Sequence, residues 1–148
     1  MKTFELEILT PERPFFNGEC VSITLPLTDG MIGIMAGHSP LTAAVDNGRI
    51  SFTDPSGNVR ICAVSRGMVN VGSRRVRVLC ESAVYPEDID EEAERLRMQE
   101  AEIEMRKRQS YEDYTVSQLA FAKSFNLLKV KQYSEKNPNL YTVLSYKL

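Results

Sequence analysis

The sequence predicts an antiparallel β-sandwich or flattened barrel of roughly 85 residues, followed by two α-helices. Glycine marks the boundary, because all 8 Gly lie between Gly18 and Gly72, and six of the 7 Pro fall at or before Pro86. Charge changes at the same point. Residues 1–86 carry 8 basic and 8 acidic groups, residues 87–113 carry 5 and 11, and residues 114–148 carry 5 and 1. Turn-forming residues are therefore concentrated in the first part, and the second part is a charged region that is expected to be helical.

The strands of the first part are indicated by short apolar patterns. Phe4, Leu6 and Ile8 alternate with polar residues, with the period of two that half-buries a strand. The segments 21–25 and 76–80 repeat this alternation. Shorter runs between them predict five further strands, at 31–35, 41–45, 49–52, 59–64 and 68–71.

Three turns separate these strands. The segment 53–58 contains Pro followed by Ser and Gly, which predicts a hairpin because Pro presets one turn residue and Gly accepts positive φ. Asp29-Gly30 and Asn47-Gly48 mark the other two turns.

The second part predicts two helices. Asp88 is the expected N-cap of the first, and Glu91 completes a capping box. Its apolar stripe is thin and consists of Ile89, Ala93, Leu96 and Ile103. The second helix is predicted over about 113–132. The expected divisions are a sandwich domain over 1–86, a helical hairpin over 87–133 and a flexible tail over 134–148.

Composition excludes several classes of protein. The chain has 148 residues and a net charge of −2, which supplies no footprint for nucleic acid. The longest uncharged stretch, 30–45, is too short and too interrupted for a bilayer span, and residues 1–5 lack the apolar core of a signal peptide, so a cytosolic chain is expected. Cys20, Cys62 and Cys80 are expected to be buried, reduced thiols.

No catalytic constellation is found, so no catalytic residue, metal or cofactor is expected. His38 and Ser39 are adjacent, but the G-x-S-x-G elbow that would expose such a serine is absent. Both phosphate-binding glycine motifs are absent as well. The acidic cluster at 87–94 fits the solvated start of a helix better than a metal site.

One segment carries a family resemblance. The run Asp-Gly-Met-Ile-Gly-Ile-Met-Ala-Gly-His-Ser-Pro-Leu, residues 29–41, resembles the (E/D)G-x-(L/I)GI-x-x-GH-(A/S)PL run of the epsilon subunit of F-type ATP synthases. The opening at 6–18, with its Phe-Asn-Gly, is similar to that family's first strand and F-x-G turn. Residues 65–71 and 88–90 resemble its later strand pair and its entry to the helices. The resemblance covers residues 3–132.

The resemblance implies a sandwich of about ten strands and an antiparallel helical hairpin in the central stalk, without activity of its own. The chain would couple the gamma shaft to the membrane c-ring in proton-driven ATP synthesis, and sit at the cytoplasmic face of the cell membrane through the complex. The implied c-ring contacts are Asp29, Gly30, Met31, Ile32, Gly33, His38, Ser39, Pro40, Leu41 and Thr42.

The resemblance implies a helical hairpin that can extend along gamma toward the catalytic head and block rotation. Lys123, Lys129 and Lys131 would then attract an acidic segment of the catalytic alpha and beta subunits. Whether the hairpin is folded or extended, and whether the coupling ion is H⁺ or Na⁺, stays open. The alternative interpretation is a free-standing β-sandwich adaptor whose basic helix binds an acidic protein.

The chain departs from the family at one point. Some members bind ATP through Ile-Asp-x-x-Arg-Ala, whereas Ile89 and Asp90 are here followed by Ala93 and Glu94. The Arg is therefore missing, and the added carboxylate repels phosphate. No ATP binding is expected.

Overall fold

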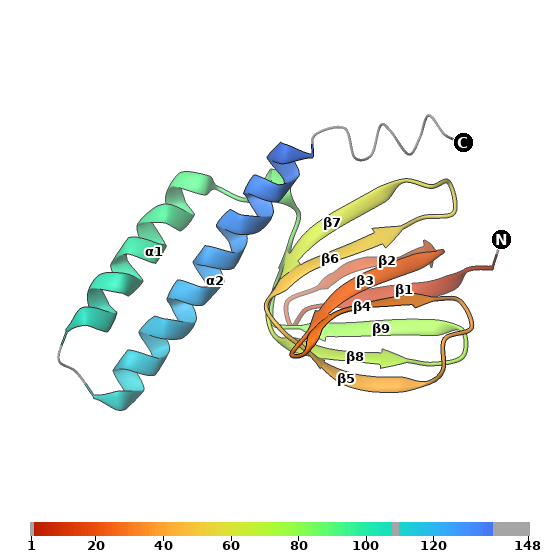
Figure 1. Cartoon of the computed structure of the whole chain (residues 1–148), viewed down its shortest axis with the longest axis horizontal. Helices are drawn as coiled ribbons and strands as arrows, with labels where there is room; N and C mark the ends of the chain where they lie inside the picture. The colour runs from red at the N-terminus through yellow and green to blue at the C-terminus, as the bar shows by residue number, and fades with distance from the viewer. Residues whose placement is uncertain (1, 108–109, 138–148) are drawn as a thin grey trace.

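The computed structural model describes residues 2–107 and 110–137. A β-sandwich forms one half of the molecule, and two antiparallel helices lie folded along its side (Figure 1). The predicted fold class is confirmed.

The described residues contain ten strands in two layers. One layer runs β4-β3-β6-β7-β10, the other runs β5-β8-β9-β1-β2, and the single pair Leu27–Val45 joins β3 to β5. All pairs are antiparallel except β1 with β9. The strands are β1 (Phe4–Leu9), β2 (Pro14–Cys20), β3 (Ser22–Leu27), β4 (Gly30–Met35), β5 (Leu41–Val45), β6 (Gly48–Thr53), β7 (Val59–Val64), β8 (Gly67–Val71), β9 (Arg75–Cys80) and β10 (Ala83–Val84).

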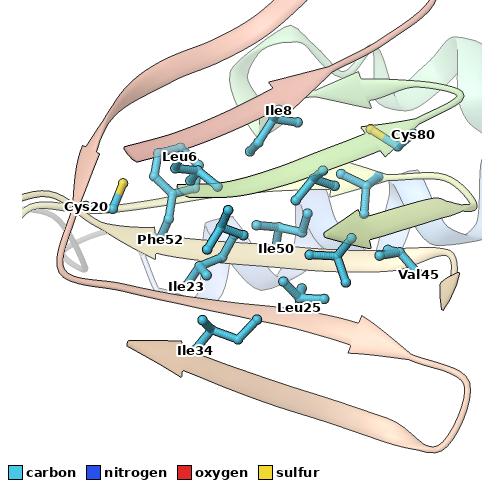
Figure 2. Close-up of a cluster of buried hydrophobic side chains, with 14 of the residues drawn as sticks. Leu6, Ile8, Cys20, Ile23, Leu25, Ile34, Val45, Ile50, Phe52 and Cys80 are labelled. Atoms are coloured by element: carbon cyan, nitrogen blue, oxygen red, sulfur yellow. The ribbon is translucent and has the colours of Figure 1, made fainter. Parts of the chain in front are cut away.

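Apolar side chains from both layers fill the space between them. Leu6, Ile8, Ile23, Ile50 and Phe52 meet there (Figure 2). The alternation predicted for the segments that form β1 and β9 is confirmed, since residues 4, 6, 8, 76, 78 and 80 are all buried. Each fully buried Leu, Ile or Phe contributes about 1.5–3 kcal/mol, which makes this core the main source of the sandwich's stability.

The turns follow the expected chemistry, with one correction. Gly30 and Gly57 adopt positive φ in the β3–β4 and β6–β7 turns. The F-x-G segment, however, is not a turn. Asn17 lies inside β2 and pairs with Glu7 of β1, because this edge strand continues past the glycine to Cys20.

The helix bounds differ from the prediction: the first helix begins later than expected, and the second begins earlier and ends later. Asp88 belongs to a short 3₁₀ turn, η1 (Pro86–Asp88), and Asp90 caps α1 (Glu91–Arg106) by accepting from the Ala93 amide at 3.1 Å. The second helix, α2 (Tyr111–Lys136), extends past 132, so the first residues of the predicted tail are helical. The rest of that tail, 138–148, lies outside the described residues.

The predicted apolar stripe of the first helix is buried only in part: Ile89 is buried just before α1, but the stripe does not continue inside the helix. Leu96 and Ile103 are 60% and 56% exposed, whereas Glu94 and Ala101 are buried. The reason is the packing partner. α1 packs mainly on α2 rather than on the sandwich, so a small residue and an ion-paired one occupy its inner face.

The second helix docks on the outer face of β7. Leu127 and Val130 of α2 pack with Ala63 of β7 and with Ile89, which follows η1. Asn126 adds two hydrogen bonds to the sandwich backbone, with Nδ2 donating to the carbonyls of Gly48 and Val64 at 3.3 Å each. This small cluster, separate from the main core, holds the hairpin against the sheet.

Candidate interaction surfaces

The layer that faces away from the helices carries an apolar row on its outer face. Ala44 of β5 pairs with Met68 of β8, Met68 with Leu79 of β9, and Leu79 with Leu9 of β1. These four residues therefore lie side by side across four strands, and we call them the apolar row. Met68 and Leu79 are 51% and 50% exposed. Exposed apolar residues gathered in this way mark a protein-binding surface more often than singly scattered ones do.

A cavity of about 490 Å³ opens beside the apolar row. Leu9, Met68 and Leu79 line it together with Pro11, and the charged Arg66 and Glu81 also belong to its lining. The apolar row therefore borders a shallow, open hollow of the surface.

The next positions along the same strands are polar. Thr42 accepts a hydrogen bond from Asn70 Nδ2 at 3.0 Å, and Arg77 Nε donates to Glu7 at 2.9 Å. Arg75 pairs with Glu5 at 3.2 Å one step further. Such exposed pairs add little stability. Their arrangement instead gives the apolar row a polar border, as is typical of an interface.

Gly67 of β8 leaves no room for a side chain against the backbone of β9 at the end of the apolar row. A Cβ placed on Gly67 would lie 1.8 Å from the Leu79 carbonyl oxygen and 2.7 Å from the Cys80 Cα. Only glycine permits this approach without moving one of the strands. Glycine thus fixes the position of Leu79 relative to Met68.

The predicted ring-contact residues are divided between the two ends of β4. Asp29 lies in the β3–β4 turn, Gly30 begins β4, and Met31 lines a cavity against α2. His38, Ser39 and Pro40 follow the other end of β4, about 17 Å away for a six-residue strand. Leu41 and Thr42 begin β5. Ile32 is half-buried and Gly33 exposed within β4 itself.

His38 and Ser39 do not form a catalytic pair. The His38 Nδ1 atom contacts the Ser39 backbone carbonyl at 2.7 Å, which is a local loop interaction. Among the described residues no cluster of His, Cys, Asp and Glu could hold a metal ion. Within that part of the chain no helix is both long and apolar enough to cross a membrane.

The three predicted head-contact lysines do not share one helix face. Lys131 Nζ donates to the Pro86 carbonyl at 3.1 Å and so ties α2 to η1. Lys129 lies 5.4 Å from the Phe125 ring centroid, and Lys123 lines the groove between the helices. Their spacing of six and two residues spreads them around the helix, since one turn holds 3.6.

The groove between the helices has a volume of about 570 Å³ and is rich in carboxylates. Glu94, Glu100 and Glu104 line it, opposed by Arg97 and Lys123. Glu94 is buried and ion-paired with Arg97. Of the four positions compared with the ATP motif, Ile89 is buried against α2 and Asp90 caps α1, while Ala93 donates to that cap.

Sequence reasoning missed the apolar row, although a signal for it exists. In the alternation of 75–80, the outward positions hold Arg75, Arg77 and then Leu79. Leu79 is thus an apolar residue at an outward-facing position where the pattern otherwise has charged residues, and such a residue favours contact with a partner. The sequence does not show that Met68, Ala44 and Leu9 join it, because strand order and register decide that.

The family model and the most similar relatives point to the same protein family. Residues 3–86 match the family model described as the beta-sandwich domain of the ATP synthase delta/epsilon chain. The ATP synthase epsilon chain of Ruminiclostridium cellulolyticum is 34% identical over 124 residues, 84% of this chain and 92% of that protein. The epsilon chain of Caldicellulosiruptor bescii is 30% identical over 136 residues, 92% of this chain and 98% of that protein.

Two solved structures share the fold. A chain in the cryo-EM structure of Euglena gracilis mitochondrial ATP synthase, comprising OSCP, F1 and c-ring, aligns with a TM-score of 0.74 and 17% identity over 90% of this chain and 81% of that chain. A chain in the Tetrahymena thermophila mitochondrial ATP synthase central stalk and c-ring aligns with a TM-score of 0.59 and 10% identity over 88% of this chain and 97% of that chain.

Proposed function

Because the chain belongs to the ATP synthase epsilon chain family, we propose that it is a non-catalytic subunit of the central stalk of an F-type ATP synthase. The sandwich joins the gamma shaft to the c-ring, so that rotation passes between them. The chain stays at the cytoplasmic face of the cell membrane only through the complex. It needs no cofactor for this role, which is mechanical.

The apolar row is the observation that supports a gamma contact. It lies on the layer opposite to the helices, with Met68 and Leu79 half exposed. Burying an additional apolar row against a partner is favourable by about 25 cal/mol per Å². We assign this face to gamma, with the ion pairs of Arg75 and Arg77 at its border.

The gamma contact is tested by substituting Met68→Glu, which places a charge in the apolar row. The full-length chain is expected to lose co-purification with gamma, because the charge would be desolvated in the interface. Met35→Glu is the matched control, since Met35 is 66% exposed on β4 and lies outside the row. Retention of gamma by Met68→Glu at wild-type level would reject the assignment.

The ring contact remains a proposal for both groups of residues at the ends of β4. The two ends are tested separately by two single substitutions, Asp29→Cys and Ser39→Cys. Cross-linking to a c-ring cysteine from either position supports the contact and identifies the end that makes it. Absence of cross-links from both positions would contradict it.

The helical hairpin is proposed to act as a brake on ATP hydrolysis. Few contacts hold it, and the cluster of Ala63, Ile89, Leu127 and Val130 is small. A folded and an extended state can exchange only when they differ by a few kcal/mol, and such a small docking surface is compatible with that balance.

Extension would break the Lys131–Pro86 hydrogen bond and free that ammonium group, together with Lys123 and Lys129, for acidic partners on the catalytic subunits. Deletion of residues 86–148 is expected to raise ATP hydrolysis by the assembled complex. Unchanged hydrolysis would eliminate the brake. A triple Lys→Gln variant at the three positions then separates the charge contribution from the presence of the helices.

A further inference from the structure

A second cavity, of about 440 Å³, lies between the sandwich and the C-terminal half of α2. Its walls come from β3, β4 and β6 on one side and from α2 on the other. The cavity exists only while α2 is docked, because neither wall encloses it alone. Any ligand that fills it therefore stabilises the docked hairpin.

The charges around this cavity are all positive. Arg49 of β6 faces Lys129 and Lys136 of α2, which stand seven residues apart and so lie on the same helix face. None of the described residues that line the cavity is Asp or Glu. The adjacent Asp46 is directed to Arg66, at 3.8 Å. Three cations without a lining carboxylate favour an anion.

Arg49 is held in place before any ligand arrives. Its guanidinium carbon lies 3.7 Å from the centroid of the Tyr133 ring, so it stacks on that ring. Its Nε is buried and has no hydrogen-bond partner among the described residues. A buried donor without a partner is costly, and the stacked guanidinium lines the cavity, so Arg49 presents a preorganised cation at its wall.

We propose that this cavity binds a compact inorganic oxyanion with two or more negative charges, such as phosphate or pyrophosphate. Arg49 supplies the cation that Tyr133 holds, Lys129 and Lys136 supply two more, and Asn47 and Gln132 supply amide groups. The anion joins β6 to α2 and so acts as a latch on the folded hairpin. This inference concerns the isolated chain and does not depend on the role in ATP synthase.

The lining distinguishes an inorganic anion from a nucleotide. A base needs an aromatic or broad apolar platform, but the Tyr133 ring already carries Arg49 on one face. The remaining apolar residues, Pro26, Met31 and Val130, are aliphatic and small in number. The cavity is also distinct from the groove between the helices, which contains Lys123 and three carboxylates.

The site is tested by isothermal titration calorimetry, in which sodium pyrophosphate is added to the full-length chain at constant ionic strength. Saturable binding with a dissociation constant of about 1 mM or below is expected, and Arg49→Gln should weaken it at least tenfold. Lys129→Gln should also weaken it. Lys123→Gln, which removes the same charge from α2 outside the cavity, should leave it unchanged.

Amide hydrogen exchange gives the second readout. Pyrophosphate is expected to slow exchange in residues 127–133 of the wild-type chain several-fold, and to have no such effect in Arg49→Gln. Exchange in β1 and β9 reports whether each variant keeps its sandwich. Three results would overturn the proposal: no saturable binding, weakening by Lys123→Gln instead of Arg49→Gln, or ATP binding tenfold more tightly than pyrophosphate.

Discussion

Asn126 of α2 reaches across to β6, where its Nδ2 donates to the Gly48 carbonyl at 3.3 Å. The same amide donates to the Val64 carbonyl on β7, also at 3.3 Å. One side chain thus links α2 to two neighbouring strands of one layer. It adds two hydrogen bonds, each worth about 1 kcal/mol, to the small apolar cluster that holds the hairpin.

Replacing Asn126 by Ala is expected to loosen the hairpin without harming the sandwich. Two hydrogen bonds of about 1 kcal/mol each are lost, so the docked state should be weaker by about 1–3 kcal/mol. Hydrogen exchange in α2 should rise while exchange in β1 and β9 stays constant. Ser117→Ala serves as the control, because Ser117 Oγ bonds only within α2, to the Asp113 carbonyl. Equal α2 protection in both variants would contradict the expected role.

Replacing Gly67 by Ala is expected to destabilise the sandwich. The new Cβ would meet backbone atoms of β9, with the nearest at 1.8 Å, so the strands must separate. We expect a loss of at least about 2 kcal/mol in the free energy of unfolding, measured by urea denaturation. Gly33→Ala is the control, since nothing lies within 4 Å of its Cβ position. If Gly67→Ala is as stable as that control, β8 and β9 can move apart without a loss of stability, which contradicts the prediction.

The buried thiols predict a loss of stability at alkaline pH. Burial raises the pKa of Cys20 to about 12, with the Asp54 charge adding to the effect, and burial raises the pKa of Cys80 to about 11. Burial raises the pKa of Cys62 as well. These pKa values in the folded chain exceed the value of about 8.5 in the unfolded chain. The thiols' contribution to the free energy of unfolding is therefore complete below that pH and is lost as the pH rises toward 11–12.

Between about pH 9 and pH 10.5, each such thiol should lower the free energy of unfolding by about 1.4 kcal/mol per pH unit. Cys20→Ala is therefore expected to show a shallower slope than wild type by about that amount, whatever its stability at pH 7. Urea denaturation across the range measures both slopes. Parallel curves would mean that the thiol also stays protonated in the unfolded chain.

The groove between the helices is expected not to bind ATP. A triphosphate there would approach Glu94, Glu100 and Glu104, whose carboxylates oppose it. Amide chemical shifts of Ala101 and Leu127, which line the groove, should not change in a saturable manner on addition of ATP. Saturation at millimolar concentration or below would show that Arg97 and Lys123 outweigh the three acids.

The helical part shows where sequence reasoning failed. The expected stripe used Leu96 and Ile103, yet both are exposed, while Glu94 and Ala101 face α2. Periodicity identifies a helix but not the partner that selects its buried face. Here that partner is another helix with small and polar residues at the contact, Ser124 among them, and the apolar pattern of α1 does not report it.

The sequence by itself determined the two-part plan and most strands, because alternation, glycine and charge are local properties that act wherever the chain is. It also carried the family motif at 29–41, but not the division of those residues between two ends of β4. Tertiary structure alone decided that Ala44, Met68, Leu79 and Leu9 form one row and that Arg49 meets Tyr133. Both depend on pairing between segments far apart in the chain, and the free energy of that pairing comes from the shared core rather than from any one segment.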